Sequence, residues 1–534
     1  MIAALCNPAC VGGSCERVRL LETHISYVLL TGEYAYKIKK PVRLGFLDFT
    51  TLAARQFYCE QELHLNRRLA PALYLDVVAI TGSADLPEIG GSGPILDYAV
   101  KMREFPQEAL LSTVLERNAL APDHIDQLAA IVARFHKGIA VAPADGPFGA
   151  PDDVLQFALA NFSEIRALFV DAEHGKEIDE LETWTRNEYA LRCGTLAARR
   201  QAGFVRECHG DLHLGNIALI DGALTIFDGI EFNDRMRWID VMSEVAFTVM
   251  DLEHCGHGAY AQRFLNTYLE ESGDYSGVAV LRFYVVYRAM VRAKIACLRA
   301  TQLTAGSARP ALPRDYHDYV RLAKAYTIAA WPAVIVTHGF AGCGKTTLSQ
   351  ELLERTGAIR IRTDVERKRL HGLGAHETSR SGIDGELYAP DATRVTYRQV
   401  STLARIVVAS GFAVLIDGTF LRRWQRDLFR GLATELGVPF AIVDICANEV
   451  TLRERVRQRA RVGQDASEAG IAVLEHQLRT DEPLGLDERV DVVPYDGELP
   501  REHAHAADAW RGIMDRLGAA AAATFVSRPR CAGP

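Results

Sequence analysis

The sequence contains no apolar run that approaches the roughly 18 residues that a membrane-spanning helix needs. Its first residues, Met-Ile-Ala-Ala-Leu-Cys, are too short and too poor in positive charge for a secretory signal peptide. The 11 cysteines are odd in number and scattered, so they form no disulfide framework of the kind that small secreted domains use. We therefore expect a protein of the reducing cytoplasm that has no membrane partner.

Three of the cysteines, Cys6, Cys10 and Cys15, cluster near the start of the chain. No pair of cysteines or histidines follows them at the spacing of a zinc finger. We therefore expect residues 1–22 to be a loosely ordered tail that carries free thiols.

The chain also lacks a strong excess of charge of either sign. Its 60 lysines and arginines and its 68 aspartates and glutamates give a formal net charge of −8 over 534 residues. So mild a charge gives no support to a protein that coats nucleic acid or a membrane surface. It argues against nucleic acid as a partner, although a local basic site in the C-terminal half stays open.

The length exceeds what one hydrophobic core organises, so two or three domains are expected from 534 residues. The first half begins with strand-like segments and turns helical from about residue 122 to residue 200. The second half alternates apolar strands, loops and helices, as a parallel α/β sheet does. The expected order is a tail (1–22), a first domain (23–303), a linker with a short helix (304–331), a second domain (332–518) and a disordered tail (519–534).

A phosphate-binding loop is the most specific motif of the chain. Residues 339–346 read Gly-Phe-Ala-Gly-Cys-Gly-Lys-Thr and fit G-x-x-x-x-G-K-[ST] without exception, between an apolar strand and an amphipathic helix. The glycines let backbone N–H groups surround phosphate oxygens, the lysine reaches the β- and γ-phosphates, and the threonine hydroxyl ligates Mg²⁺. The residues expected at the nucleotide are Gly339, Gly342, Gly344, Lys345, Thr346 and Thr347.

Two carboxylates accompany this loop. Asp417 ends an apolar strand at residues 414–417, which is where a metal-binding carboxylate of a P-loop enzyme lies. Asp364 follows a shorter strand, at the sheet edge where ligands bind, and could accept a proton from a substrate hydroxyl. The alternative for Asp364 is a helix N-cap.

Five arginines alternate through residues 451–462. On a helix, Arg455 and Arg459 share one face and could present guanidinium groups to the phosphoryl group in transfer. The alternative is a solvated basic helix face.

Together these motifs resemble the small P-loop kinases of the zeta-toxin, gluconate-kinase and polynucleotide-kinase group, over about residues 333–517. The resemblance implies an α/β P-loop NTPase domain with a parallel sheet and ATP binding of the AAA type. It also implies that Asp364 acts on the acceptor hydroxyl and that a lid arginine assists.

The first half carries a second set of phosphotransfer residues. Asp211 and Asn216 lie in His-Gly-Asp-Leu-His-Leu-Gly-Asn, and Asp228 follows after a short strand, turn and strand. Phosphoryl transfer needs one carboxylate that orients the acceptor hydroxyl, and an amide oxygen and a second carboxylate that hold Mg²⁺. The alternative is a loop of turn-forming residues in which these side chains are caps.

This segment resembles the aminoglycoside-phosphotransferase and choline-kinase group, whose catalytic loop reads H-G-D-x-x-x-x-N, over about residues 24–303. The resemblance implies an α+β, two-lobed, protein-kinase-like domain. In it Asp211 is the catalytic base, and Asn216 and Asp228 are the Mg²⁺ ligands.

A lysine on a strand should pair with the ATP phosphates and with a glutamate on a helix. Lys37 fits this position, with Lys39 as a competitor on the same strand face, and Glu62 is the expected partner. The chain departs from protein kinases at the turn of residues 31–33, which lacks a G-x-G-x-x-G loop.

The sequence thus predicts an enzyme with two kinase modules, each of which transfers the γ-phosphoryl group of Mg-ATP to a hydroxyl of a small-molecule acceptor. One alternative is an ATP-binding regulatory protein in which only one module turns over. Another is a toxin-like or polynucleotide-end kinase in the C-terminal half. The sequence names neither acceptor and gives no oligomeric state.

Overall fold

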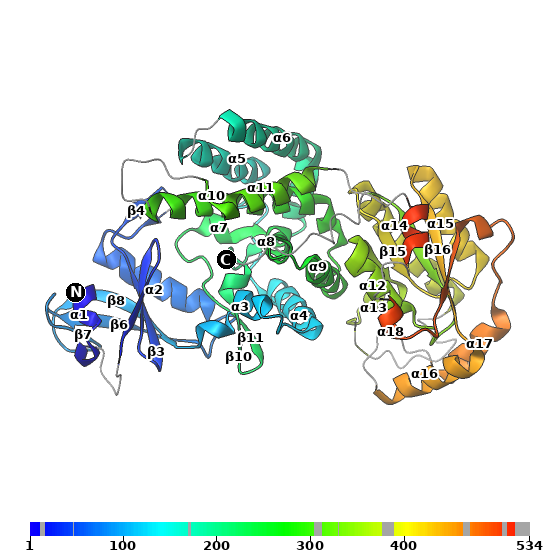
Figure 1. Cartoon of the computed structure of the whole chain (residues 1–534), viewed down its shortest axis with the longest axis horizontal. Helices are drawn as coiled ribbons and strands as arrows, with labels where there is room; N and C mark the ends of the chain where they lie inside the picture. Colours follow the sequence, from blue (N-terminus) through cyan, green and yellow to red (C-terminus); the bar gives the residue numbers. More distant parts are fainter. Residues whose placement is uncertain are drawn as a thin grey trace. The chain divides into compact units, whose positions relative to one another are not determined.

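A computed structural model describes residues 1–10, 17–45, 47–168, 172–303, 312–328, 331–375, 377, 389–462, 470–504 and 510–517. The chain forms two compact units. Figure 1 shows their helices and strands with labels. The first unit comprises Met1–His124, Phe135–Val154 and Ala197–Thr248, and the second comprises Ile125–Arg134, Leu155–Leu196 and Val249–Pro534. The expected C-terminal tail and residues 304–311, 329 and 330 of the expected linker lie outside the described residues.

An antiparallel sheet opens the first unit. Its strand order is β1-β2-β3-β8-β6-β7, and the hairpin expected at residues 23–39 is its β2–β3 pair. The long helix expected next is α2, which packs against β8 and β6 and buries Glu62 on its inner face. The bounds are β1 Arg19–Glu22, β2 Ser26–Leu30, β3 Tyr34–Lys39, α2 Leu52–Asn66, β6 Tyr74–Gly82, β7 Pro87–Ile89 and β8 Ile95–Arg103, with the short pair β4 Arg43–Leu44 and β5 Leu47–Asp48.

The first residues are ordered, so the expectation of a loose tail is wrong for them. They form the helix α1 (Ile2–Leu5), the 3₁₀ turn η1 (Pro8–Cys10) and the edge strand β1. The physical reason is apolar packing, because Leu5 is fully buried against Leu29 and Ile38 of the sheet. Cys15 lies outside the described residues.

The segment of the first unit that contains Asp211, Asn216 and Asp228 is built on short antiparallel pairs of strands. The strand β9 (Val205–Glu207) pairs with β12 (Trp238–Asp240), and β10 (Ile217–Ile220) pairs with β11 (Ala223–Ile226). Asp221 and Gly222 join the latter pair with positive φ angles of 50° and 77°, which a two-residue hairpin turn of this hand requires. The strand–loop–strand pattern expected at residues 208–232 is therefore present.

The helical pattern expected throughout residues 122–200 is interrupted. Residues 139–150 leave the helix, and Val141 bridges to Arg206 instead. Prolines at 143 and 147 explain the break, since proline cannot donate to a helix ladder. The helices and turns up to residue 327 are η2 Gln107–Ala109, α3 Leu111–Glu116, α4 Pro122–Gly138, α5 Pro151–Leu168, α6 Ala172–Gln201, η3 Leu214–Asn216, α7 Asp234–Arg237, α8 Val241–His254, α9 Gly258–Ser272, η4 Tyr275–Gly277, α10 Val278–Leu303 and α11 Arg314–Thr327.

A parallel sheet with the strand order β14-β15-β13-β16-β17 forms the centre of the P-loop domain. Every residue of β13, β14 and β15 is buried, as a sheet covered by helices on both faces requires. The expected parallel α/β class is confirmed, and β17 is a strand that the sequence pattern had not revealed. The bounds are β13 Val334–His338, α12 Lys345–Thr356, β14 Ile359–Arg362, α13 Thr363–Leu370, α14 Pro390–Ala409, β15 Val414–Asp417, α15 Arg423–Leu436, β16 Phe440–Cys446, α16 Glu449–Val462, α17 Ile471–Thr480, η5 Arg489–Asp491, β17 Val492–Asp496, α18 Arg501–Ala504 and α19 Arg511–Arg516.

In the part of the chain that the structure describes, no helix combines the length and the apolar character that a membrane crossing needs.

Candidate active sites

The loop of residues 339–346 joins β13 to α12 in a conformation that only glycine tolerates. Gly339 has a φ angle of 138°, and a Cβ atom there would lie 2.5 Å from the Ile445 carbonyl oxygen. Gly342 has a φ angle of 87°, and a Cβ atom there would lie 2.8 Å from the Leu452 carbonyl oxygen. The helix α12 starts at Lys345, so its first two residues are the last two of the motif. Its first-turn N–H groups and the positive end of its dipole therefore face the loop, as phosphate binding requires.

The Lys345 ammonium is held against this loop. Its Nζ donates to the carbonyl oxygens of Gly339 at 3.0 Å and Phe340 at 2.7 Å. A phosphate placed in the loop would offer the same ammonium a charged partner.

A cavity of about 940 Å³ gathers most of the residues that the sequence predicted for this half. Gly339 shapes the loop but is not part of the cavity wall. The predicted residues in the wall are Gly342, Gly344, Lys345, Thr346, Thr347, Asp364, Asp417, Arg455 and Arg459.

Asp417 ends β15 and is only 6% exposed. Its Oδ2 accepts a hydrogen bond from Ser349 Oγ at 3.2 Å, and Arg362 Nε lies 3.8 Å away. The Asp417 carboxylate and the Thr346 hydroxyl line one cavity and are oxygen donors, so they fit Mg²⁺.

Asp364 is the second residue of α13, and Arg362 is the N-cap residue, so the N-cap alternative for Asp364 is wrong. Asp364 lies in the cavity wall together with Tyr397. Burial, with a smaller contribution from the Asp364 charge, raises the pKa of Tyr397 above its usual value. The tyrosine therefore stays neutral beside the carboxylate.

The arginine helix is α16. Arg455 donates through Nη1 to the Gly497 carbonyl oxygen at 2.8 Å, and both Arg455 and Arg459 lie in the cavity wall. Arg457 and Arg461 are exposed, so the alternative of a solvated face applies to them. The expected shared face of Arg455 and Arg459 is present.

In the first unit, Lys37 lies at the centre of a charged cluster. Its Nζ is 2.8 Å from Glu62 Oε1 and also donates to the Asp228 carboxylate. Burial alone would raise the pKa of the Glu62 carboxyl, but the charges of Lys37 and Lys39 outweigh burial and hold that pKa at about 2. The strand lysine, the helix glutamate and the candidate metal ligand Asp228 are thus brought together.

Lys39 has a different set of partners from Lys37. Its fully buried ammonium pairs with Glu62 Oε2 at 2.8 Å and with Glu231. Lys39 therefore stabilises the position of Glu62, while Lys37 contacts both Glu62 and Asp228. Glu231 was not predicted, although it lies three residues after Asp228 in Asp-Gly-Ile-Glu.

The candidate catalytic loop, residues 209–216, holds Asp211 and Asn216 in contact. Asn216 Nδ2 donates to the Asp211 backbone oxygen at 3.0 Å and to its Oδ2 at 3.1 Å. Because the amide nitrogen is used there, the Asn216 amide oxygen is the donor left for a metal. Asp228 has a positive φ of 63°, and its backbone N donates to the Tyr74 hydroxyl at 3.1 Å. The oxygen donors of Asn216 and Asp228 fit Mg²⁺.

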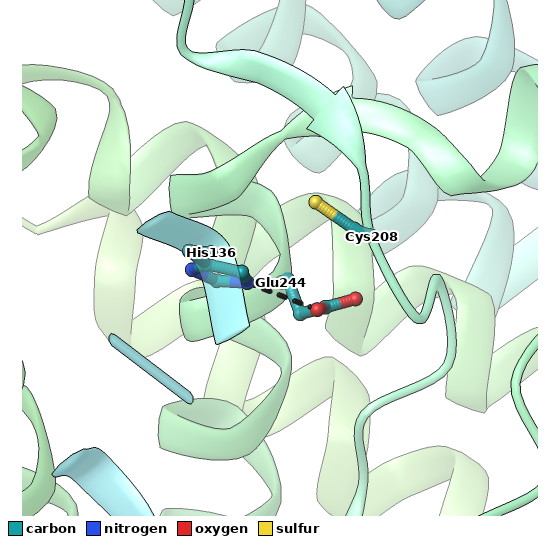
Figure 2. Close-up of side chains that lie close together, drawn as sticks. All are labelled: His136, Cys208 and Glu244. Carbon is teal, nitrogen blue, oxygen red and sulfur yellow. Dashed lines mark hydrogen bonds and ion pairs between the residues drawn. The ribbon is translucent and has the colours of Figure 1, made fainter. Parts of the chain in front are cut away.

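The buried Glu244 carboxylate holds the candidate catalytic loop through hydrogen bonds to its backbone. Glu244 of α8 accepts hydrogen bonds from the backbone N–H groups of His209 at 3.2 Å and Gly210 at 2.6 Å, and its Oε1 lies 3.0 Å from His136 Nε2. Cys208 lies beside this pair in Figure 2, with its thiol directed to the Ile239 carbonyl oxygen at 3.6 Å. Since both Glu244 oxygens already accept hydrogen bonds, we interpret the cluster as a support for the loop rather than as a metal centre.

Glu244 supports a prediction for stability. Its pKa is held at about 2, because the His136 and backbone hydrogen bonds outweigh burial. Compared with an ordinary glutamate pKa near 4.5, this shift stabilises the fold by about 3 kcal/mol above pH 4.5, and the contribution is lost as the pH falls toward 2. We expect Glu244→Gln to lower the free energy of unfolding by about 3 kcal/mol at pH 7 and by about 1.5 kcal/mol at pH 3, as measured by urea denaturation.

Glu116→Gln, at an exposed helix position, is the matched control and should change the free energy of unfolding little at either pH. A loss at Glu244→Gln that is equal at pH 7 and pH 3 would contradict the assigned role of the charge.

Two family models match this chain, one for each site. Residues 49–283 match the Phosphotransferase enzyme family, and residues 334–484 match an AAA domain. The chain therefore combines a phosphotransferase domain with a P-loop kinase-like domain, and its enzyme class is that of a kinase. Kinase families in general use ATP and Mg²⁺.

Relatives share both domains. Uncharacterized proteins of Mycobacterium tuberculosis (strain ATCC 25618 / H37Rv) and Mycobacterium bovis (strain ATCC BAA-935 / AF2122/97) are each 29% identical over 493 residues, which are 92% of this chain and 95% of the relative. Among solved structures, a choline/ethanolamine kinase family protein from Mesorhizobium loti matches with a TM-score of 0.37 and 10% identity, over 59% of this chain and 89% of that chain. A gluconokinase from Sinorhizobium meliloti matches with a TM-score of 0.25 and 23% identity, over 35% of this chain and 93% of that chain.

Proposed function

We propose that this chain is a bifunctional kinase whose two modules each transfer the γ-phosphoryl group of Mg-ATP to a hydroxyl of a small-molecule acceptor. The observation that supports the proposal is that each module contains a lysine ammonium, side-chain oxygen atoms that fit Mg²⁺ and a carboxylate that is a candidate for the acceptor site. As the sequence predicts, we place this activity in the cytoplasm.

In the first module, Lys37 binds phosphate oxygens and Glu62 orients its ammonium. Asp211 accepts the proton of the acceptor hydroxyl while that oxygen bonds to the γ-phosphorus, and ADP leaves with the electrons of the broken P–O bond. Mg²⁺, when bound by Asn216 and Asp228, supplies positive charge to the phosphates.

In the second module, the loop backbone and Lys345 bind the phosphates, and Thr346 and Asp417 hold Mg²⁺. Asp364 accepts the acceptor proton, and the charges of Arg455 and Arg459 stabilise the phosphoryl group in transfer.

The alternative of a regulatory nucleotide-binding module has less support. Nucleotide binding alone needs no carboxylate at the acceptor position, yet Asp211 contacts Asn216 within the catalytic loop.

The alternative of a polynucleotide-end kinase would need a basic surface for a nucleic acid strand, and Arg422 and Arg423 lie next to Trp424 in the sequence of the C-terminal half. Arg423 pairs with Asp427 and Asp487, and Arg422 with Glu482, so acidic partners offset this basic patch. A small acceptor fits such a surface better than a nucleic acid strand does.

The test of the proposal is acceptor-dependent ADP formation by the whole chain, across a panel of sugars, hydroxy acids, nucleosides, aminoglycosides and short oligonucleotides. The double variant Asp211→Asn/Lys345→Ala measures the background. We expect at least two acceptors to be phosphorylated by the native chain only. If no acceptor raises ADP formation above the double variant, the proposal is wrong.

The cavity of the second module also supports an acceptor that carries a negative charge. Arg394 of α14 is exposed and forms part of the cavity wall that contains Asp364. A charge-assisted hydrogen bond contributes about 1.5–3 kcal/mol. We therefore expect Arg394→Gln to raise the KM of the Lys345-dependent acceptor about 10- to 100-fold and to leave the KM of ATP nearly unchanged, in steady-state kinetics.

Arg398→Gln is the matched control, because Arg398 is exposed on the same helix and is not part of the cavity wall. A preference of the second module for neutral acceptors over hydroxy acids would contradict this prediction.

A further inference from the structure

The edge strand of the parallel sheet, β14, is covered by a helix that precedes the P-loop in the sequence. The side-chain amide of Asn266 in α9 forms two hydrogen bonds with this strand region. Its Oδ1 accepts one from the Arg360 backbone N–H at 2.6 Å, and its Nδ2 donates one to the Ala358 carbonyl oxygen at 3.2 Å. The Tyr275 hydroxyl donates to the Arg360 carbonyl oxygen at 3.2 Å. An edge strand offers unpaired backbone groups, and these side chains satisfy them. The helix α9 and β14 belong to the same compact unit.

Glu270 lies one helical turn after Asn266, so both side chains share a face of α9. Its Oε1 is 2.7 Å from Arg360 Nε and 2.7 Å from Arg360 Nη2, and its Oε2 is 3.7 Å from Arg362 Nη1. Glu270 is 8% exposed, so this contact is largely shielded from water. One carboxylate thus faces two arginines of β14.

The same two arginines contact the candidate metal ligand of the P-loop site, Asp417, either directly or through Ser349. Arg360 Nη1 donates to Ser349 Oγ at 3.3 Å, and Ser349 Oγ donates to Asp417 Oδ2 at 3.2 Å. Arg362 links Glu270 and Asp417 without an intervening residue, because its Nε lies 3.8 Å from Asp417 Oδ2. Arg360, Ser349 and Asp417 are all buried. The buried chain of contacts therefore runs from Glu270 to the oxygen atom that would bind Mg²⁺.

We propose that Glu270 is a positioning residue of the P-loop site, which holds Arg360 and Arg362 so that the Asp417 carboxylate stays oriented for Mg²⁺. This inference rests on the proposed role of Asp417. Without the Glu270 charge, the Arg362 guanidinium would keep the Asp417 carboxylate as a partner, and the Arg360 guanidinium would still reach it through Ser349. Those groups would compete with the metal for its oxygen atoms, because a buried charge without a partner is costly.

Glu270 lies inside the stretch that matches the phosphotransferase family and outside the stretch that matches the AAA domain. The P-loop site would then be complete only when the residues of α9 are attached to it. This would favour keeping both domains in one chain.

The test uses the full chain in a background of Asp228→Asn, which removes the candidate metal ligand of the first module. The affinity for Mn²⁺ in the presence of ADP, measured by electron paramagnetic resonance, reports the P-loop site without any turnover. We expect Glu270→Gln to weaken Mn²⁺ binding about 10- to 100-fold, the usual effect of residues that support metal ligands. ADP binding without metal should change by less than about twofold, because the loop and Lys345 are untouched.

Glu271→Gln is the matched control, since Glu271 is the exposed neighbour on the same helix. An unchanged Mn²⁺ affinity in Glu270→Gln would overturn the proposal, and so would an equal loss in Glu271→Gln or an equal loss of metal-free ADP binding. If Glu270→Gln does not fold, Glu270→Ala takes its place, because it also removes the charge, and wild-type Mn²⁺ affinity in that variant overturns the proposal. Failure of the kinase proposal would be visible separately, as an absence of acceptor turnover in the native chain.

Discussion

Asp211→Asn will reduce turnover at the first module by about 10²–10⁴-fold in kcat, the contribution of a positioned general base. Asparagine keeps the shape of the side chain and can still contact Asn216, which lies 3.1 Å from Asp211 Oδ2. It cannot accept the proton that the acceptor hydroxyl must lose. We therefore expect kcat to fall while the KM of ATP stays nearly constant, as measured by acceptor-dependent ADP formation.

Asp221→Asn is a sharp control for this variant. Asp221 lies in the turn between β10 and β11 with a φ of 50°, a conformation that asparagine tolerates well, and its side chain is exposed. The same chemical change ten residues away should leave both activities intact. If Asp211→Asn leaves the turnover of every acceptor unchanged, the first module is better explained as a nucleotide-binding regulatory domain.

Most of the site residues that the sequence could predict lie in short motifs, and the pair of Lys37 and Glu62 is the exception. The spacing of Asp211 and Asn216 predicts a site because both residues lie in one loop. The glycines before Lys345 predict a phosphate-binding site for the same reason. The structure places these residues as the motifs require, since the flanking strands and helices form locally. Their catalytic roles remain predictions.

The residues that the sequence did not predict act across distant segments. Glu231 reaches Lys39, Glu244 reaches the catalytic loop, and Glu270 reaches β14, in each case through a fold that brings distant parts of the chain together. A single carboxylate has no local signature, so only the tertiary structure identifies its partner. Glu244 offered a weak signal, because it is a charged residue within the apolar run of residues 241–252.

The error at the N-terminus has a related cause. The apolar residues Ile2–Leu5 are too few to predict a helix from periodicity. Their order comes from the sheet against which Leu5 packs, and that sheet is formed by residues further along the chain.

Lys345→Ala will reduce kcat/KM for ATP at the second module by about 10²–10³-fold, the effect of removing one preorganised donor to developing charge. The Lys345 ammonium lies against the carbonyl oxygens of Gly339 and Phe340, in the loop where the phosphates would bind. Its loss removes the only motif residue of that loop that carries a full positive charge. The backbone N–H groups and α12 stay in place, so residual nucleotide binding should remain, as measured by titration with ADP.

We expect Lys345→Ala to leave the activity of the first module unchanged, and Asp211→Asn to leave the activity of the second module unchanged. This reciprocal pattern is the feature that separates two catalytic sites from one site with a regulatory neighbour. Lys137→Ala, an exposed change of the same kind, controls for the loss of a surface charge. If Lys345→Ala and Asp211→Asn instead abolish the phosphorylation of the same acceptor, the two modules act on one substrate in succession. If Lys345→Ala changes no activity at all, the P-loop domain is not a kinase, because phosphoryl transfer from ATP needs that charge at the β- and γ-phosphates.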